Sequence, residues 1–516
     1  MKKFWRRITV NALAGLTGLF LLSCGKTDKK PLNILLITAD DLNYNSVGAF
    51  GSKIDDITPN LDRLASQGKV FNDAHVTIAV CQPSRGVLMT GKYPHRNGIP
   101  GFHKTNIPDL PTLPEELQKG GYAIGLLGKM HHSSPKSDIQ WDVQLDGFGS
   151  LGLGRDPERY YEECLTFLNK SKEAGKPFFL MANSHDPHRP FALSDQEQWA
   201  INGKYWNGKV PRKPSRVYKP EEVNVPDFLP DLQQVRLEMA EYYTSVHRLD
   251  ETVGRILDAL EESGMADNTL VMFLSDNGMA FPFAKTNCYL NSTRTPWIVR
   301  WPGVVKAGTS DSDHGISGVD YMATVLDAVG LPEPSSMDGH SFLPLLEGDK
   351  QEGREFVYTQ FNETSARRRF TMRCVQDGNF GYIFSPWSDG KLAFKNESQH
   401  GRTFKAMRAA ADSLPEVATR VKLFENRVVE EFYDLKNDPD ALKNLANDPL
   451  YKQEKERFEK ALEKWMVEME DPALEAFRKR NDPEALKAFM DQENKDAKEL
   501  SKMAKGHERM EETRRW

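Results

Sequence analysis

The chain has 516 residues, of which 39% are hydrophobic and 28% are charged, an ordinary globular composition with enough length for a large core and more than one domain. Its 74 acidic residues outnumber its 68 Lys and Arg residues, which gives a formal net charge of −6. We therefore expect no nucleic-acid partner, since such binding requires a strongly basic surface. An anionic substrate would have to be held by a local cluster of cationic side chains or by a metal.

The first 23 residues have the pattern of an export signal. Basic residues at the start precede an apolar stretch from Thr9 to Leu22 that is too short to span a membrane. Residues 21–25 read LLSCG, which resembles a bacterial lipobox, with cleavage before Cys24 and a lipid on its sulfur. We predict a lipoprotein signal peptide over residues 1–23 and a tether over 24–31, so that the exported chain is anchored to a bacterial membrane and faces the periplasm or the cell surface. The alternative is a plain signal peptide that ends near a cysteine.

Short apolar runs alternate with helical patterns between residues 32 and 350. The runs have the length of buried strands and are Asn33–Thr38, Ala123–Leu127, Pro177–Ala182 and Leu270–Leu274. The clearest helix is expected over Leu237–Gly264, where apolar residues recur every three or four positions. This alternation predicts an α/β fold, a doubly wound and mostly parallel sheet flanked by helices, and we assign residues 32–350 to one catalytic domain.

Each apolar run leads into polar or ionisable residues. These residues are Asp40, Asp41, Lys129, His131, His185, His188, Asp276 and Asn277. In open α/β sheets ligands bind beyond the carboxyl ends of the strands, so we expect these side chains to line one site. Ordinary loops would carry mainly Gly, Ser and Asn at such positions.

The oxygen-bearing side chains in this set suit a hard divalent cation. An Asp-Asp pair after a strand is often only a helix cap or a loop, and Asp-Asn-Gly is common turn composition. At the ends of two strands of one sheet, however, Asp40, Asp41, Asp276 and Asn277 offer three carboxylates and an amide. That donor set favours Ca²⁺ over zinc or copper.

A cysteine lies at the start of a further predicted helix. Pro83 fits the first turn of a helix, so Cys81 would lie beside the positive end of its dipole, and Arg85 follows one turn later. This placement predicts a lowered thiol pKa and a reactive sulfur, and the alternative is a buried structural cysteine. The spacing of the remaining cysteines indicates neither a disulfide framework nor a zinc site. They are Cys164, Cys288 and Cys374.

The last third of the chain changes character. Short aromatic and β-branched runs at Phe356–Tyr358 and Phe380–Ile383 predict a small antiparallel sheet, which we place in a C-terminal α+β subdomain over residues 351–450. Residues 451–516 are rich in charge and helix-favouring residues and are expected to form a charged helical tail, solvated or frayed at its end.

The segment Cys81-Gln82-Pro83-Ser84-Arg85, followed by Thr90-Gly91, resembles the C-x-P-S-R signature of type I sulfatases, members of the alkaline phosphatase superfamily. The resemblance implies that a formylglycine-generating enzyme or an anaerobic maturase oxidises Cys81 to formylglycine (3-oxoalanine). The hydrated aldehyde is then the nucleophile that attacks sulfur. In that family the metal ligands lie at D-D and D-N-G positions, here Asp40, Asp41, Asp276 and Asn277, and the oxygen on residue 81 completes the coordination.

Further segments match the family's sulfate-binding positions. Gly128-Lys129-Met130-His131 is similar to its G-K-x-H motif, which implies that Lys129, His131 and Arg85 orient and polarise the hydrate. By the same resemblance His188 contacts the sulfate and protonates the leaving atom, and Lys285 is the sulfate-binding cation. We expect His185 to support these residues without contacting the sulfate.

The heparan N-sulfatase (sulfamidase) branch of this family is the most similar, through segments around His185-Asp186-Pro187-His188-Arg189 and Ser275-Asp276-Asn277-Gly278. One departure is Lys285, where that branch has arginine and O-sulfatases have lysine. The resemblance thus implies hydrolysis of sulfate from a polysaccharide or its oligosaccharides, with an O-sulfate ester favoured and N-sulfoglucosamine the other substrate. Two alternatives stay open: a phosphonate or phosphate ester hydrolase of the same superfamily, and a non-catalytic lipoprotein that binds sulfated glycan.

Overall fold

The computed structural model describes residues 30–102 and 110–514. The predicted signal peptide, the lipidation site Cys24 and most of the tether lie outside these residues and stay predictions. From residue 32 onward the chain forms one compact unit, and the fold is described for this unit. Among the described residues, no helix combines the length and the apolar character that crossing a bilayer requires.

A large sheet forms the centre of this unit. Its strands are β1 (Asn33–Asp40), β2 (Lys69–Phe71), β4 (Ala123–Leu127), β5 (Val143–Leu145), β6 (Phe178–Pro187), β7 (Thr269–Ser275), β8 (Trp297–Arg300) and β9 (Thr309–Asp311). In the described part of the chain they form one eight-stranded sheet in the order β5-β4-β6-β1-β7-β8-β2-β9. All neighbours are parallel except β8, which runs antiparallel to both β7 and β2. The predicted mostly parallel sheet is confirmed, and four of its strands are the apolar runs expected from the sequence.

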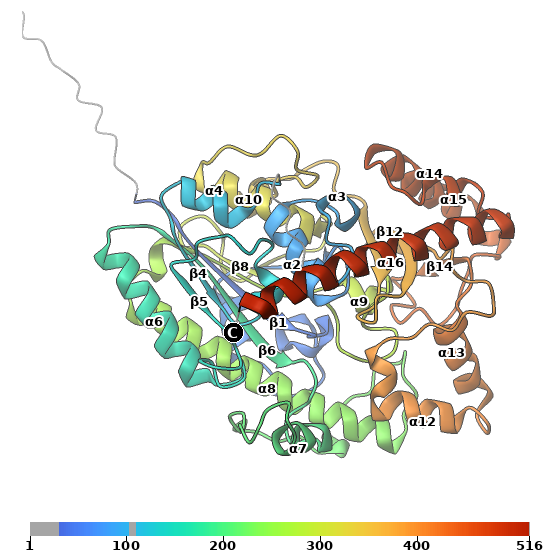
Figure 1. The fold of residues 1–516 in the computed structure, drawn as a ribbon, viewed down its shortest axis with the longest axis horizontal. Coiled ribbons are helices and arrows are strands. Elements are labelled where there is room, and N and C mark those ends of the chain that lie inside the picture. Colours follow the sequence, from blue (N-terminus) through green and yellow to red (C-terminus); the bar gives the residue numbers. More distant parts are fainter. Residues whose placement is uncertain (1–29, 103–109, 515–516) are drawn as a thin grey trace, which may run out of the picture. The chain divides into compact units, whose positions relative to one another are not determined.

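The sheet is buried on both faces, which explains why its strands are continuously apolar. Successive side chains of a strand point to opposite faces, and in β1 Leu35 and Ile37 belong to one hydrophobic core while Ile34 and Leu36 belong to another. The first core is closed by α1 (Pro59–Ser66), α6 (Pro157–Glu173) and α8 (Gln233–Glu262), and the second by α2 (Cys81–Thr90), α4 (Leu113–Lys119), α10 (Tyr321–Val329) and α11 (Leu343–Glu347). Figure 1 shows α6 and α8 on one side of the strands and α4 and α10 on the other.

Shorter elements connect these layers. They are β3 (Ala74–His75), which pairs with β10 (Ile316–Ser317), and the helices α3 (Pro94–Asn97), α5 (Met130–Ser133), α7 (Asp195–Asn202) and α9 (Leu290–Thr293).

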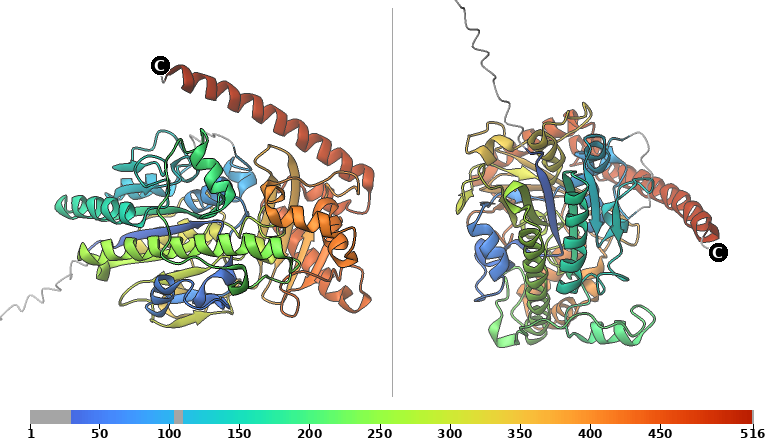
Figure 2. Two further views of the ribbon diagram at one scale, coloured as in Figure 1. Left: turned by 90° about the horizontal axis from the view of Figure 1, so that it is seen from below. Right: turned by 90° about the vertical axis from the view of Figure 1, so that its left-hand side faces the viewer.

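A second, antiparallel sheet follows, as the aromatic runs predict. Its strands, in spatial order, are β11 (Val357–Glu363), β12 (Arg369–Gln376), β13 (Phe380–Phe384) and β14 (Glu430–Asp434). The helices of this part are α12 (Arg402–Ala410), α13 (Pro415–Asn426), α14 (Lys452–Glu468), α15 (Leu474–Arg478) and α16 (Pro483–Arg514), and Figure 2 shows α16 as the long red helix at the C-terminal end. The smaller α+β part is confirmed; the boundaries at residues 350 and 450 stay predictions, because the chain from residue 32 clusters as one unit.

The charged tail is helical, but its first helices are part of the core. Trp465 of α14 stacks on Tyr358 of β11, with ring centroids 5.3 Å apart and an interplanar angle of 6°. Phe458 of α14 packs edge-on against Phe432 of β14, and Phe477 of α15 is buried against Phe384 of β13. These apolar residues lie on one face of otherwise charged helices, so the high charge of the segment reflects only the solvated face.

The register of the large sheet places the carboxyl ends of its central strands side by side. Thr38 of β1 lies opposite Asn183 of β6, and Ala39 of β1 lies opposite Ser275 of β7. Because these strands are parallel, the residues that follow each of them emerge at the same edge. The segments after β1, β4, β6 and β7 therefore meet, as the sequence predicts.

Candidate active site

Four side chains converge at this edge. Ligand atoms of Asp40, Asp41, Cys81 and His188 all lie within 4.8 Å of one another. The sulfur of Cys81, the first residue of α2, is 3.3 Å from Oδ1 of Asp40 and 3.9 Å from Oδ1 of Asp41. Asp41 has a left-handed backbone with φ of 70°, which lets the chain turn sharply after β1 while both carboxylates stay beside the sulfur.

The residues after β7 complete the oxygen cluster. Oδ1 of Asp276 accepts a hydrogen bond from the backbone N–H of Asp41 at 3.2 Å, and Nδ2 of Asn277 donates to Oδ1 of Asp41 at 2.7 Å. Gly278 follows where a Cβ would lie only 2.0 Å from the carbonyl oxygen of Asn291, so no larger residue fits. The Asp-Asp pair and the Asp-Asn-Gly turn, ordinary when read alone, are thus parts of one site.

The cluster fits a hard divalent cation. Asp40, Asp41 and Asp276 are fully buried carboxylates, and Oδ1 of Asn277 is a buried oxygen without a hydrogen-bond partner among the described residues. Burial and the neighbouring carboxylates of Asp40 and Asp41 raise the pKa of Asp276 to about 7. Such crowding of carboxylates, with an unpaired amide oxygen beside it, is relieved when the oxygens coordinate a cation.

Two lysines face these carboxylates. Nζ of Lys129 pairs with Oδ2 of Asp40, and Nζ of Lys285 lies 2.7 Å and 2.8 Å from the two oxygens of Asp41. Burial disfavours the charged form of Lys285, but Asp41 and other neighbouring acids raise its pKa well above the ordinary value, so it stays an ammonium. Lys285 also pairs with Glu397, which comes from a short 3-10 helix (Glu397–His400) of the C-terminal part and which the sequence analysis did not identify.

Arg85 lies beneath the cluster and is fully buried. Its Nε is 2.8 Å from Oδ2 of Asp276, and its Nη1 donates to Oγ1 of Thr38 at 2.7 Å and to Oδ1 of Asn183 at 2.6 Å. Arg85 therefore ties the ends of β1 and β6 to a candidate metal ligand.

The prediction that the Cys81 thiol has a lowered pKa is wrong. Burial, together with the nearby Asp40 carboxylate, raises the pKa of the Cys81 thiol well above its ordinary value. The helix N-terminus favours a thiolate, but the acidic cluster and the loss of solvent disfavour it more strongly. The protein groups around Cys81 therefore favour the protonated thiol over the thiolate.

The histidines have distinct positions. Nε2 of His185 accepts the backbone N–H of Lys129 at 3.1 Å, which agrees with a supporting position behind the site. Nε2 of His188 is 3.8 Å from Oδ2 of Asp41, and its side chain is 28% exposed. His131 is exposed and lines the pocket. Its neighbour His132, which the sequence analysis did not identify, also lines it, and burial together with Lys129 lowers the His132 pKa well below its ordinary value.

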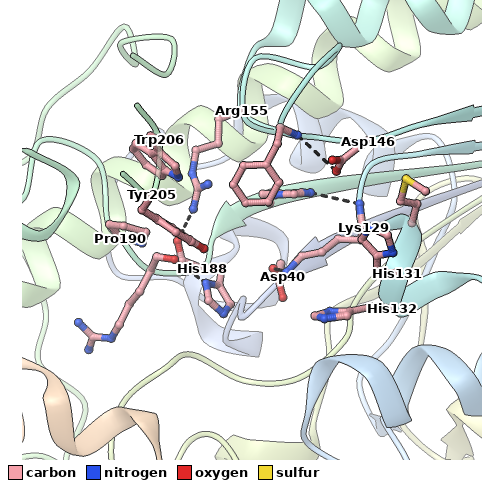
Figure 3. Close-up of a pocket in the computed structure, with 14 residues that line it drawn as sticks. Asp40, Lys129, His131, His132, Asp146, Arg155, His188, Pro190, Tyr205 and Trp206 are labelled. Carbon is pink, nitrogen blue, oxygen red and sulfur yellow. Dashed lines mark hydrogen bonds and ion pairs between the residues drawn. The ribbon is translucent and has the colours of Figure 1, made fainter. Parts of the chain in front are cut away.

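Asp40, Lys129 and the histidines at positions 131, 132, 185 and 188 line one end of a pocket of about 230 Å³. In Figure 3, Lys129, His131 and Asp146 lie on one side, Arg155, Tyr205 and Trp206 on the other, and Asp40 and His188 between them. The pocket thus combines a buried ionic end with an aromatic side, which suits a ligand with an anionic group on a larger, partly apolar body.

Comparisons with known proteins identify the family. The family model described as Sulfatase matches residues 32–331, and the model described as N-sulphoglucosamine sulphohydrolase, C-terminal, matches residues 280–383. The human N-sulphoglucosamine sulphohydrolase is 31% identical over 476 residues, which cover 88% of this chain and 93% of the human protein. An ulvan-active sulfatase of Formosa agariphila is 30% identical over 448 residues, covering 85% of this chain and 80% of that protein.

A solved structure of a protein in complex with its substrate D-glucosamine-2-N,6-O-disulfate shares the fold. Its TM-score is 0.63 at 20% identity, and the match covers 86% of this chain and 99% of that chain. The Sulfatase match spans more than half of this chain, so the chain belongs to the sulfatase family. It is a sulfuric ester hydrolase, and membership of the family implies a metal ion and a formylglycine at the site.

Proposed function

We propose that the chain hydrolyses sulfate from sulfated glucosamine units of a polysaccharide or its oligosaccharides, with Ca²⁺ as the metal and formylglycine derived from Cys81. The observation that carries this proposal is the position of the Cys81 sulfur, 3.3 Å from Asp40 and surrounded by buried carboxylates and lysines. Formylglycine, when hydrated, would supply a hydroxyl nucleophile. Asp40, Asp41, Asp276 and Asn277 would hold the cation, which would supply positive charge beside that hydroxyl.

The chain's own residues would act on the sulfate. Desolvation disfavours the charged forms, but neighbouring acids raise the pKa of the half-buried Lys129 and of the buried Lys285, so both remain charged. Fixed charges in a water-poor site stabilise developing negative charge without reorganisation. His188 is partly exposed, lies 3.8 Å from Asp41 and would deliver a proton to the leaving atom of the sugar. Arg85 would keep Asp276 oriented, and His131 and His132 would contact the substrate at the pocket mouth.

Two observations bear on the linkage that is cleaved. The match to the sulphohydrolase C-terminal family begins at residue 280, just before Lys285, and the human relative in the same family is named for N-sulphoglucosamine, which supports an N-sulfo bond. Lys285 in place of arginine supports an O-sulfate ester. Because the two observations point to different linkages, substrates of both kinds are needed to test the proposal.

Biogenesis follows from the same residues. The Cys81 side chain is only 2% exposed, so a maturase would have to reach it before the site closes during folding. The N-terminal pattern around Cys24 supports export as a lipoprotein with a membrane-anchored N-terminus.

Turnover of a defined panel tests the proposal. The panel contains N-sulfoglucosamine, glucosamine 6-sulfate, a 2-O-sulfated disaccharide and a phosphonate monoester, and the protein is produced in a host with a maturase. We expect sulfate release from at least one sulfated sugar and at least tenfold slower turnover of the phosphonate. Faster turnover of the phosphonate would favour the phosphoesterase alternative. Binding of the sugars without any turnover by formylglycine-containing protein would favour the non-catalytic alternative.

A further inference from the structure

Two of the three exposed aromatic residues in the described part of the chain line the pocket. Among the described residues, the exposed large aromatic side chains are Phe148 (37%), Trp199 (72%) and Tyr205 (59%), and all three come from the segment between β5 and α8. Phe148 and Tyr205 line the pocket, together with the buried Trp206. Single exposed aromatics are common on protein surfaces, but their gathering at the mouth of a site indicates a ligand contact.

The pocket-lining aromatic residues form a continuous surface, here called the aromatic wall, which consists of Phe148, Tyr205 and Trp206. The rings of Phe148 and Tyr205 meet edge to face with centroids 6.0 Å apart, and those of Tyr205 and Trp206 are stacked at 6.2 Å. Figure 3 shows Tyr205 and Trp206 on the side of the pocket opposite Lys129. The wall therefore faces the space above the buried charges.

Hydrogen bonds and a cation–π contact fix the position of the aromatic wall. Trp206 is 2% exposed, its backbone N–H donates to the carbonyl of Ala200 at 3.0 Å, and the guanidinium of Arg155 lies 5.5 Å from its ring centroid. Nζ of Lys209 donates to the carbonyl of Phe148 at 2.8 Å. Rings fixed in this way lose little conformational freedom when a ligand binds, which favours affinity.

We propose that Phe148 and Tyr205 form a subsite that binds the ring of the sulfated sugar; this inference rests on the proposed function. The face of a pyranose carries C–H groups with slight positive charge, which match the negative face of an aromatic ring. With the sulfate at the ionic end near Lys129, the sugar ring would lie against the wall. The carboxylate of Asp146, which also lines the pocket and whose Oδ1 accepts the backbone N–H of Phe148 at 3.4 Å, would accept hydrogen bonds from the hydroxyl or amino groups of the sugar.

If this subsite exists, loss of either ring should weaken binding of the sugar without changing binding of inorganic sulfate. Removing either ring takes away contact that is equal in the ground state and the transition state, so KM rises while kcat stays nearly constant. Inorganic sulfate reaches only the ionic end, so its inhibition constant does not change.

The test uses the full mature protein with Phe148→Ala and Tyr205→Ala, each compared with Trp199→Ala as the matched control. Trp199 is exposed and belongs to the same segment but does not line the pocket. We expect KM for the preferred sulfated sugar to rise by about tenfold in each pocket variant, the size of a typical lost aromatic stacking contact. The control keeps the KM of the wild type, and Tyr205→Phe, which retains the ring, restores it.

A binding measurement separates failure of this inference from failure of the proposed function. Saturation-transfer NMR with unsulfated glucosamine reports sugar contact without turnover, and we expect the signal from the sugar ring protons to be lost in Phe148→Ala and Tyr205→Ala. If the wild type turns over sulfated sugars but both variants keep KM and the NMR signal, the subsite is wrong and the proposed function stands. If no sulfated sugar is turned over, the proposed function fails, and the NMR comparison alone decides the subsite: a signal that depends on the two rings supports it, and an absent or unchanged signal overturns it.

Discussion

Two nitrogens of Arg85 contact one carboxylate oxygen of Asp276. Nε and Nη2 of Arg85 lie 2.8 Å and 2.7 Å from Oδ2 of Asp276, and both side chains are fully buried. The other oxygen of Asp276 is thereby turned toward Asp41, where it accepts the backbone N–H. The arginine of the C-x-P-S-R segment thus orients a carboxylate of the proposed metal site.

Replacing Arg85 with Lys should weaken metal binding. A single ammonium cannot reproduce the planar fork that fixes Asp276, and loss of a residue that orients a metal ligand typically lowers affinity by about 10–100-fold. Calcium titration by calorimetry measures the effect, with Arg255→Lys, on the surface of α8, as the control. Unchanged calcium affinity in Arg85→Lys would show that Asp276 needs no such support.

Asn277 should contribute through its oxygen. Its Oδ1 is buried and lacks a partner among the described residues, whereas its Nδ2 donates to Asp41. Asn277→Ala removes a ligand and should lower calcium affinity by about tenfold or more, while Asn277→Asp should retain binding because it keeps an oxygen donor. Equal affinity of the Ala variant and the wild type would remove Asn277 from the ligand set.

Glu397 should moderate the binding of sulfate at Lys285. The ammonium of Lys285 is shared between Asp41 and Glu397, whose side chain is 30% exposed. Desolvation opposes ionisation of the Glu397 carboxyl, but neighbouring charges, above all Lys285, lower its pKa to about 2, so it is ionised at working pH. In Glu397→Gln one negative charge is lost, and inorganic sulfate should inhibit about threefold to tenfold more strongly, an effect of about 1 kcal/mol. Lys285→Met should weaken the same inhibition. Weaker inhibition in both variants would mean that Glu397 holds Lys285 in position more than it competes with sulfate.

The sequence was sufficient to predict four neighbouring strands of the eight-stranded sheet and the meeting of their ends. The apolar runs that became β1, β4, β6 and β7 are buried on both faces, so their hydrophobicity is continuous and easily recognised. Parallel pairing then brings Asp40 and Asp276 to one edge regardless of the loops between them.

Contacts that depend on exact backbone geometry could not be predicted. His131 and His132 are adjacent in α5, where each residue turns the helix by about 100°, so their relative positions depend on how the helix begins at Lys129. Glu397 comes from the C-terminal part of the chain, and its local sequence carries no signal that it will meet Lys285. The pKa of Cys81 depends on the carboxylates that surround it, which the helix position alone does not reveal.

The buried carboxyl of Asp250 should make stability depend on pH. It accepts hydrogen bonds from the backbone N–H groups of Asn60 and Leu61 at the start of α1, and burial raises its pKa to about 7. The folded protein therefore holds this proton more tightly than the unfolded chain, and its stabilising effect is present near pH 4 and is lost as the pH rises to about 7. Relative to Asp250→Asn, the unfolding free energy of the wild type should fall by at most about 1.4 kcal/mol per pH unit across this range. Denaturant unfolding at pH 5 and pH 7 measures this, and a difference between the two proteins that does not change with pH would contradict it.

Sulfatase activity should depend on the chemical state of residue 81. We propose that Cys81 is converted to formylglycine before the fold encloses it among carboxylates and lysines, and that sulfatase activity depends on this change. Mass spectrometry of the peptide that contains residue 81, from preparations made with and without a maturase, measures its conversion alongside sulfate release. We predict a lighter, aldehyde-containing peptide whose fraction rises in proportion to the turnover rate. Full turnover by protein in which residue 81 is entirely cysteine would contradict the account.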